Sequence, residues 1–333
     1  MMPREISVVV PSFNRAALLP ETLDAILAQS VPPLEVIVVD DGSTDGTAAM
    51  LSARYPGLVR VLRIENSGDL AARNAGLREA SGRLVAWCDS DDVWQPEFLA
   101  AMAALWRTEP RLCAAFTDFT ILREGQHDSL RKFDTAPPGF WHGLRHLPEA
   151  GLGVFDAPVV ARLIGFQPFF PSCLVTSRAF MLGLGGWDET VGRIVGSDFA
   201  TILRIGEYAP LGVVRRPLVA IRKHAGNHSA DTEAMNLGDA AILEHVLARR
   251  ASLAGLAPQI LRSVTRRRAD ALALAFVRHD HAAVRRIFAM LPNAGRGWAV
   301  RVKAWVSQIP APLRNNAART LLALGTIRAR ARP

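Results

Sequence analysis

Three carboxylates stand within four residues at Asp89-Ser90-Asp91-Asp92, directly after the apolar, strand-like segment 83–88. Anions packed together at the end of a buried strand raise one another's pKa, and a divalent cation with oxygen ligands removes that repulsion. Mg²⁺ and Mn²⁺ take one or two protein carboxylates and complete their shells with water and substrate phosphates. This motif therefore favours a metal and a phosphate-bearing ligand. The alternative is a solvated acidic turn that caps the following helix.

A second acidic turn follows another strand-like segment. Residues 34–39 form a continuous apolar run rich in β-branched side chains, typical of a strand covered on both faces, and Asp40 and Asp41 come directly after it. An earlier strand at 6–10 and an amphipathic helix complete a βαβ pattern. Ligands of open α/β sheets bind beyond the carboxyl ends of the strands, so we expect Asp40 and Asp89 to border one crevice. For Asp41 alone, an ordinary Asp-Gly turn is the simpler interpretation.

Four motifs follow one another in the N-terminal part of the chain. They are Val8-Val9-Val10-Pro11-Ser12-Phe13-Asn14-Arg15, then Val38-Val39-Asp40-Asp41-Gly42-Ser43-Thr44-Asp45, then Ala72-Arg73-Asn74-Ala75-Gly76, and finally Asp89-Ser90-Asp91-Asp92. In this order they resemble glycosyltransferase family 2, and the resemblance extends over about residues 5–230. It implies an α/β protein with the GT-A fold, a Rossmann-like nucleotide-binding mixed sheet flanked by helices. It also implies an inverting reaction with a nucleotide-sugar donor and a divalent metal.

The resemblance implies which residues bind the donor. They are Pro11, Ser12, Asn14, Asp40, Asp41, Arg73, Asp89 and Ser90. Asp40 would contact the nucleobase, and the donor is expected to be a UDP-sugar, with another nucleotide left open. Arg73 would present its planar guanidinium to a phosphate or to a carboxylate of the site. Considered alone, Arg73 could equally be a solvated helix arginine.

Metal ligands are expected at Asp91, at Asp89 either directly or through water, and at His224. Asp92 would be a further ligand or would accept a hydrogen bond from a sugar hydroxyl. His224 stands in the segment 219–229, which resembles the closing element of the family, and its imidazole would suit Mn²⁺ better than Mg²⁺. A metal here would stabilise the charge that develops on the leaving diphosphate. The alternatives for His224 are a donor to the diphosphate and a merely hydrogen-bonded histidine.

The acceptor half contains a motif that resembles the family's element of two glycines, an aromatic residue and two acids, Gly185-Gly186-Trp187-Asp188-Glu189. Its glycines would let the backbone wrap the donor sugar, and Asp188 or Glu189 would accept hydrogen bonds from sugar hydroxyls. Gly186, Trp187 and Asp188 are therefore expected at the sugar. Trp141, in a long irregular stretch at 123–165, would either stack on an acceptor sugar or anchor the loop in the core.

Asp198 matches the general base of the family. An inverting displacement needs a carboxylate on the acceptor side that takes the hydroxyl proton, and Asp198 could in addition cap the helix that follows it. The family pattern at 197–200 is Glu-Asp-aromatic-Asp, whereas this chain has Ser197 and Ala200 in place of the flanking acids. Their absence predicts a more acidic and weaker base. It also leaves an alternative function, a nucleotide-sugar-binding protein with weakened or lost transferase activity.

Charge divides the 333 residues into two parts. Residues 239–333 contain 17 arginines and lysines against 4 acidic residues, a net charge of +13, which leaves −5 for residues 1–238. The basic helices either lie on anionic lipid or cover the catalytic domain with a solvated arginine face. The expected organisation is a GT-A catalytic domain at 1–235, with a donor half at about 1–122 and an acceptor half at about 123–235, followed by a basic helical region at 236–333.

Composition and motifs constrain the remaining expectations. The cysteines lack metal-ligand spacing and indicate reduced thiols, and no signal peptide or membrane-length apolar run stands out. We therefore expect a cytoplasmic protein, with peripheral contact at the inner face of the membrane left open, and no nucleic-acid partner. The expected reaction adds one sugar to a glycan, a lipid-linked saccharide or a polysaccharide precursor of the cell envelope. A nucleotidyltransferase is less favoured, because Pro11-Ser12-Phe13-Asn14 stands in place of a Gly-rich phosphate loop.

Overall fold

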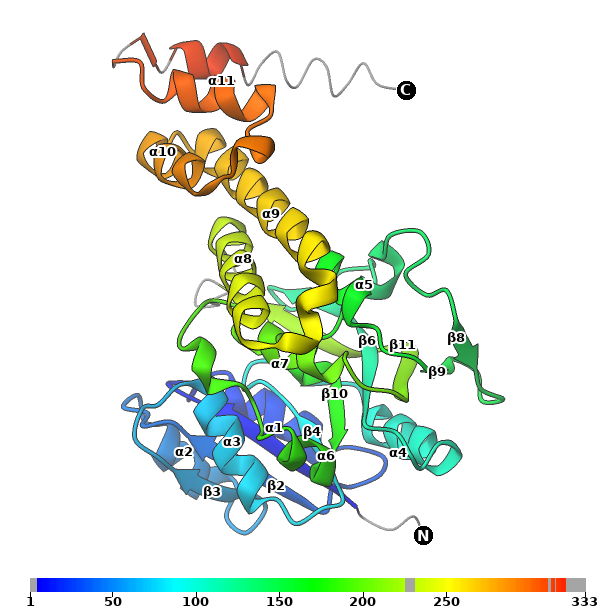
Figure 1. Ribbon diagram of the computed structural model, residues 1–333. Helices are drawn as coiled ribbons and strands as arrows, with labels where there is room; N and C mark the ends of the chain where they lie inside the picture. The colour runs from blue at the N-terminus through cyan, green and yellow to red at the C-terminus, as the bar shows by residue number, and fades with distance from the viewer. Residues whose placement is uncertain (1–4, 225–230, 311–312, 315, 322–333) are drawn as a thin grey trace. The chain divides into compact units, whose positions relative to one another are not determined.

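The computed structural model describes residues 5–224, 231–310, 313–314 and 316–321. Contacts within the chain divide it into two compact units. One is Met1–Arg193 with Ser197–Asn227, and the other is Ile194–Gly196 with His228–Pro333. We call the first the sheet unit and the second the helical unit (Figure 1).

The sheet unit is built on one mixed sheet. Its main strands run in the order β3 (Arg60–Arg63), β2 (Glu35–Asp40), β1 (Ile6–Ser12), β4 (Leu84–Trp87), β10 (Leu174–Ser177), β6 (Ala114–Arg123), β11 (Leu211–Lys223), β9 (Leu152–Phe155) and β8 (Leu144–His146). The short strands β5 (Val93–Trp94) and β7 (Gln126–His127) pair with β11 and β6. Strands β3, β2, β1 and β4 are parallel, and β10 is antiparallel to both β4 and β6. The carboxyl ends of β1, β2 and β4 therefore meet at one edge.

Helices pack on both faces of the parallel strands. On one face, apolar side chains of β1 and β2 share a core with α1 (Leu19–Leu27), α2 (Thr47–Arg54) and α4 (Phe98–Thr108). On the other face, α3 (Asp69–Glu79) lies so close that a Cβ on Gly76 would stand 2.4 Å from Cγ1 of Val9. A glycine is therefore required where α3 crosses the sheet. These strands and helices lie where the apolar runs of the sequence predict them.

Two further segments contain short elements. Residues 171–175 begin with the 3-10 turn η2 (Pro171–Cys173), and only then does β10 start. The stretch 123–165, expected to be irregular, contains β7, η1 (Lys132–Thr135), β8, β9 and α5 (Val160–Gly165). The strands β8 and β9 extend the sheet beyond β11. They escape prediction because strands of three and four residues are too short to display a periodicity. The helices α6 (Arg178–Gly183) and α7 (Asp198–Ile205) follow.

The helical unit consists of α8 (Thr232–Arg249), η5 (Ala251–Leu256), α9 (Ala257–Val277), α10 (His281–Met290), η6 (Asn293–Gly295) and α11 (Trp298–Val306). Apolar side chains of α9, α10 and α11 form its core. Between α8 and α9, Asp239 pairs with Arg267, and Glu244 pairs with Arg268. The helices α9 and α10 form a helical hairpin within the expected basic helical region, and Asp280 caps the second of them.

No helix among the described residues is long and apolar enough to cross a bilayer. The arginine-rich end expected to close the last helix, residues 322–333, lies outside the described residues, as does the segment 225–230 that follows His224. The thiols of Cys88 and Cys173 are free and buried, and their burial raises the pKa of both. These two cysteines therefore act as inert core residues.

Candidate active site

An acidic turn follows β4 at the carboxyl edge of the sheet. Oδ2 of Asp91 lies 3.0 Å from Nε2 of His224, directly after β11, and 3.8 Å from Nη2 of Arg15, which follows β1. The side chain of Asp91 is 12% exposed and that of His224 is 23% exposed, while Ser90 beside them is buried. The fold therefore brings three distant segments of the chain around one carboxylate that a small ligand can still reach.

Arg73 of α3 forms the second ionic centre. Its Nη2 lies 2.6 Å from Oδ1 of Asp89, and its Nη1 lies 2.5 Å from Oδ2 of Asp69. The guanidinium also stands 4.9 Å from the centre of the Trp187 ring. Burial alone would lower the pKa of Arg73, but Asp89, Asp69 and Asp198 raise it by more. Arg73 is thus a permanent cation, and Asp198, the first residue of α7, belongs to the same electrostatic group.

The carboxylate of Asp92 points into the protein interior. Its Oδ2 accepts a hydrogen bond from Oγ of Ser172 at 2.5 Å, and its Oδ1 accepts one from the backbone N–H of Arg222 at 2.9 Å. Burial, with the neighbouring charges of Asp91 and Asp89, raises the pKa of Asp92 well above its usual range. The hydroxyl of Ser172 also accepts from the N–H of Asp89 at 2.9 Å. This is a supporting position, and it differs from the contact to metal or sugar expected for Asp92.

The acidic turn fits a divalent cation as a partial site. Asp91 and His224 offer one oxygen and one nitrogen 3.0 Å apart, a donor set suited to Mn²⁺. Asp89, the third expected ligand, directs Oδ1 to Arg73, while its side chain is 33% exposed. Within the described residues, no three His, Cys, Asp or Glu side chains form a ready metal cluster. Two protein ligands agree with a cation that takes its other ligands from water and a diphosphate.

The carboxyl ends of β1 and β2 leave two polar groups without hydrogen bonds. Oδ1 of Asp40 accepts from the N–H of Ser43 at 2.9 Å, whereas Oδ2 lies 3.8 Å from Nη1 of Arg63 and has no hydrogen-bond partner among the described residues. Ser12 lies opposite Asp40 in the sheet and next to the buried Pro11. Its buried hydroxyl also has no hydrogen-bond partner among the described residues. These two buried oxygens could therefore still form hydrogen bonds with a ligand.

Asp41 and Asn14 stabilise the surrounding loops. The carboxylate of Asp41 accepts from the N–H of Ser67 at 2.7 Å and from the N–H of Gly68 at 2.9 Å. Asn14 has a φ of 53°, a left-handed conformation that asparagine tolerates, and its Oδ1 accepts from the N–H of Thr44 at 2.8 Å. Both side chains therefore hold loops beside Asp40, and the Asp41 carboxylate does more than the simple turn interpretation requires.

The amide of Asn74 holds the glycine-rich motif of the acceptor half. Its Oδ1 accepts from the N–H of Trp187 at 2.7 Å, and its Nδ2 donates to the carbonyl of Trp187 at 2.9 Å and to Oε1 of Glu189 at 2.6 Å. Gly186 has a φ of 81°, and a Cβ there would stand 2.2 Å from Oδ1 of Asn74. Sequence reasoning missed this role of Asn74, and only its place inside the Arg-Asn motif signals it.

Trp187 and Asp188 both support the fold of this motif. Trp187 is 1% exposed, and its ring packs edge-on against Trp87 with 5.2 Å between the ring centres. Oδ1 of Asp188 accepts from the N–H of Thr190 at 3.2 Å and caps the 3-10 turn η3 (Glu189–Val191). The ring of Trp187 therefore belongs to the core, and the expected place of this residue at the sugar stays a prediction.

Trp141 lies in an aromatic cluster of the sheet unit. The ring centres of Phe133 and Phe140 are 4.6 and 4.8 Å from its own, and its Nε1 donates to the carbonyl of Phe133 at 3.3 Å. The guanidinium of Arg215 stands 5.6 Å from the ring centre. The side chain is half-buried. These contacts are those of a side chain that anchors the loop in the core. Part of the ring remains exposed, so contact with an acceptor sugar stays a prediction.

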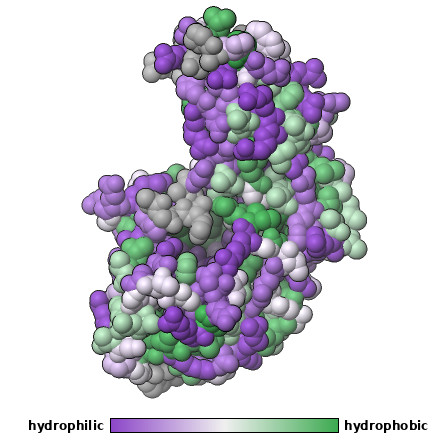
Figure 2. All heavy atoms as spheres, turned by 90° about the vertical axis from the view of Figure 1, so that its left-hand side faces the viewer, coloured by the Kyte–Doolittle hydropathy of each residue, from purple (hydrophilic) through white to green (hydrophobic). Residues whose placement is uncertain are grey.

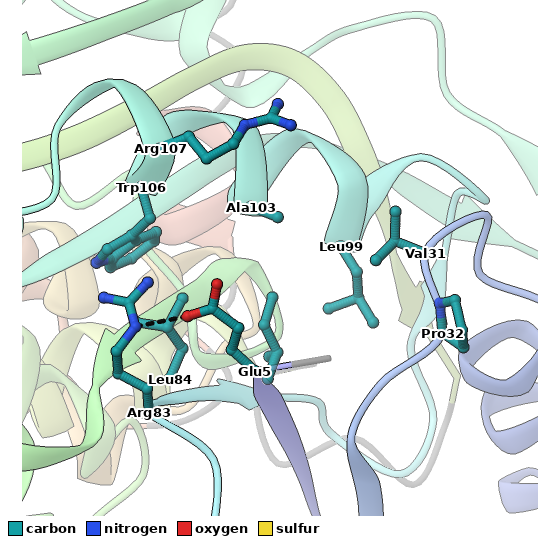
Figure 3. A pocket seen from close by; sticks show the side chains of 10 residues that line it. Glu5, Val31, Pro32, Arg83, Leu84, Leu99, Ala103, Trp106 and Arg107 are labelled. Carbon is teal, nitrogen blue, oxygen red and sulfur yellow. Dashed lines mark hydrogen bonds and ion pairs between the residues drawn. The ribbon is translucent and has the colours of Figure 1, made fainter. Parts of the chain in front are cut away.

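A pocket at the other end of the parallel strands is separate from this site (Figure 3). It is lined by Glu5, Ile6, Val31, Pro32, Arg83, Leu84, Leu99, Ala103, Trp106 and Arg107. Ile6 begins β1 and Leu84 begins β4, so the pocket lies at the amino ends of these strands. An ion pair of 2.5 Å between Arg83 and Glu5 stands in it. The pocket therefore has no part in the acidic site at the carboxyl ends.

Known glycosyltransferase sequences resemble the part of the chain that forms most of this site. Residues 7–153 match the family model described as Glycosyl transferase family 2. TuaG of Bacillus subtilis, named for teichuronic acid biosynthesis, is 37% identical over 137 residues, which are 40% of this chain and 53% of that protein. The succinoglycan biosynthesis protein ExoO of Rhizobium meliloti is 38% identical over 99 residues, 29% of this chain and 28% of that protein. The chain thus spans about half the length, or less, of these curated relatives. The similarity to glycosyl transferase family 2 is thus shown for residues 7–153.

Solved structures share the fold. Residues 1–349 of TarS from S. aureus, in complex with UDP, align with a TM-score of 0.60 at 17% identity and cover 91% of this chain and 88% of that chain. The mannosyltransferase PcManGT of Pyrobaculum calidifontis, in complex with GDP-Man and Mn²⁺, aligns with a TM-score of 0.50 at 20% identity over 95% of this chain and 86% of that chain. The expected fold, a GT-A mixed sheet flanked by helices with further helices toward the C-terminus, is confirmed.

Proposed function

We propose that this chain is an inverting glycosyltransferase that moves one sugar from a nucleotide-diphosphate sugar to a hydroxyl group. The observation that carries the proposal is the convergence of the Asp91–His224 pair and Arg73 at the carboxyl edge of β1, β2 and β4, with Asp198 in the same electrostatic group. The complexes of structural relatives with UDP, and with GDP-Man and Mn²⁺, support a nucleotide-sugar donor.

The nucleoside of the donor is proposed to lie at the ends of β1 and β2. The unsatisfied Oδ2 of Asp40 and the hydroxyl of Ser12 can form hydrogen bonds with a base or a ribose there. Asn14 and Asp41 keep the surrounding loops in place. We propose a UDP-sugar, in keeping with the UDP bound to TarS. Arg15 supplies positive charge on the side of the diphosphate.

Asp91 and His224 are proposed to hold Mn²⁺ or Mg²⁺, with Asp89 bound directly or through water. The cation would supply charge stabilisation to the diphosphate as it leaves. The chain prepares this position by anchoring the acidic turn, since Ser172 bonds both the Asp89 backbone and the Asp92 carboxylate. Asp91 is therefore placed by the backbone of its own turn before any ligand arrives.

Asp198 is proposed to accept the proton of the attacking hydroxyl group. Arg73 places a positive charge in its electrostatic surroundings, which favours the carboxylate that a base requires. Neither Ser197 nor Ala200 carries a carboxylate, so neither position offers a second acid to the acceptor. Both residues are also buried. Other groups must then position the acceptor and the donor sugar, and for this we retain Gly186, Trp141 and Asp188.

The acceptor is proposed to be a cell-envelope polysaccharide or its lipid-linked precursor. The names of TuaG and ExoO, which refer to teichuronic acid and succinoglycan biosynthesis, support a polysaccharide. We propose that the transfer takes place on the cytoplasmic side of the membrane, where one sugar is added in each reaction.

Donor turnover tests this proposal. The full chain is incubated with UDP-sugars or GDP-sugars, Mn²⁺ or Mg²⁺ and a panel of saccharide acceptors, and the glycosylated product is measured. Asp91→Ala and Asp198→Ala should abolish product formation, whereas Asp24→Asn, half-exposed on α1, should leave the rate unchanged. An unchanged rate in either of the first two variants would overturn the assigned roles. Donor binding in a calorimeter without product on any acceptor would instead favour a nucleotide-sugar-binding protein.

A further inference from the structure

The helix α11 presents two tryptophans to solvent. Trp298 is 72% exposed and Trp305 is 64% exposed. Seven positions separate them, so they share one side of the helix, and the exposed Arg301 stands between them on that side. We call Trp298, Arg301 and Trp305 the tryptophan face. Away from this face, Ala304 and Val306 are buried and pack α11 into the helical unit.

The charge of this region has one sign. Residues 281–333 contain ten arginines and lysines and neither aspartate nor glutamate. Earlier in the helical unit, Arg267 and Arg268 pair with acids of α8, whereas no carboxylate of the described residues forms an ion pair with Arg301 or Lys303. Hydrophilic residues predominate on the visible surface of the C-terminal helices in Figure 2. The tryptophan face is thus an aromatic pair within an uncompensated basic surface.

Tryptophans at such a position are unfavourable unless a partner covers them. Their rings are amphipathic, with one apolar body and one N–H donor, and such rings favour the boundary between water and lipid headgroups. Arginine and lysine beside them are attracted by the negative potential of an anionic leaflet. A solvated arginine face would account for the charge, but it would give no reason for two large aromatic side chains on the same side of one helix.

We propose that the tryptophan face of α11 docks onto the surface of an anionic lipid bilayer. Trp298 and Trp305 enter the headgroup region, and Arg301 between them contacts lipid phosphates. The bilayer is contacted from one side, which agrees with the finding that no described helix is fit to span it. Lipid binding by this face does not depend on sugar transfer. The lipid-binding proposal can therefore be tested independently of the proposed function.

Vesicle flotation with the full chain tests the proposal. One set of vesicles contains phosphatidylcholine alone, and the other contains phosphatidylcholine with phosphatidylglycerol. We expect binding to the anionic set only, with an affinity that falls as NaCl increases. Exchange of Trp298→Ala together with Trp305→Ala should weaken binding at least about tenfold, because the buried aromatic area is lost. Exchange of Arg301→Gln should weaken it about fivefold, as expected for one basic residue at the surface.

Leu58→Ser in the sheet unit is the matched control, because Leu58 is 56% exposed and stands in the other unit. It should bind vesicles like the unchanged chain. All exchanged side chains are at least partly exposed, so each variant should fold. Circular dichroism and thermal melting check this. Equal binding to neutral vesicles would overturn the proposal. Unchanged lipid binding of the double tryptophan variant would overturn it as well. This includes the case in which the variant changes only the self-association of the protein, measured by sedimentation velocity.

Discussion

Nε2 of His224 lies 3.0 Å from Oδ2 of Asp91, although 133 positions separate the two residues. The contact joins the end of β11 to the turn after β4. It is made by one nitrogen and one oxygen, so in the proposed metal site the preferred cation would depend on the nitrogen. Removal of the imidazole should therefore change metal preference as well as rate.

We predict that His224→Ala lowers turnover with Mn²⁺ more than turnover with Mg²⁺. Imidazole suits Mn²⁺, whereas Mg²⁺ prefers oxygen ligands and retains more of its water. The measurement is the ratio of kcat with the two metals, and we expect that ratio to fall by about tenfold. His146→Ala, exposed on β8, is the control. A ratio that stays constant while both rates fall would show that His224 contacts the diphosphate instead.

Asp198→Asn should lower kcat by about 10² to 10⁴ and leave donor affinity unchanged. The amide has nearly the shape of the carboxylate but cannot take a proton from the acceptor hydroxyl. Product formation and donor calorimetry are measured on the same preparation. Loss of donor binding in this variant would mean that Asp198 acts on the donor through its electrostatic neighbour Arg73.

Gly186→Ala should destabilise the protein more than Gly185→Ala. Both glycines have a positive φ, 81° and 83°, so both exchanges share a backbone cost of about 1 to 2 kcal/mol. Only at Gly186 does the new Cβ meet Oδ1 of Asn74, at 2.2 Å, whereas nothing lies within 4 Å at Gly185. We expect a further loss of about 1 to 3 kcal/mol in the free energy of unfolding, measured with denaturant. Equal losses in the two variants would contradict the hydrogen-bonded position of Asn74.

The stability of the helical unit should depend on Asp239. Burial raises the pKa of Asp239 to about 6, against the opposing charge of Arg267. Between about pH 4 and pH 6 the folded chain keeps a proton that the unfolded chain has released, so the free energy of unfolding falls as the pH rises through this window, by roughly 2 to 3 kcal/mol. Hydrogen exchange of α8 and α9 amides measures this slope. Asp239→Asn should flatten it, and Asp270→Asn, exposed on α9, should not.

The elements of the donor half could be predicted because their apolar side chains are periodic. The apolar runs before Asp40 and Asp89 form β2 and β4, and the topology of a parallel sheet then places both acidic turns at one edge. Contact between Asp91 and His224 was expected only through the family resemblance. No periodicity relates the end of β11 to the turn after β4.

The partners of these residues could not be predicted. Ser172 lies 80 positions from Asp92, and Asn74 lies 113 positions from Trp187. A single serine or asparagine carries no periodic signal, and the hydrogen bond that gives it meaning exists only after the chain has folded. The same limit applies to Trp298, whose exposure becomes visible only in the structure.

The amide of Asn74 uses both its donor and its acceptor on the backbone of Trp187, and it donates to the carboxylate of Glu189 as well. An aspartate would have almost the same shape, but it would set one oxygen against the Trp187 carbonyl and against a second negative charge. Exchange of this one amide for a carboxylate would therefore remove a hydrogen bond and add a charge repulsion between α3 and the glycine-rich loop. The loop would loosen without any cleavage of the chain.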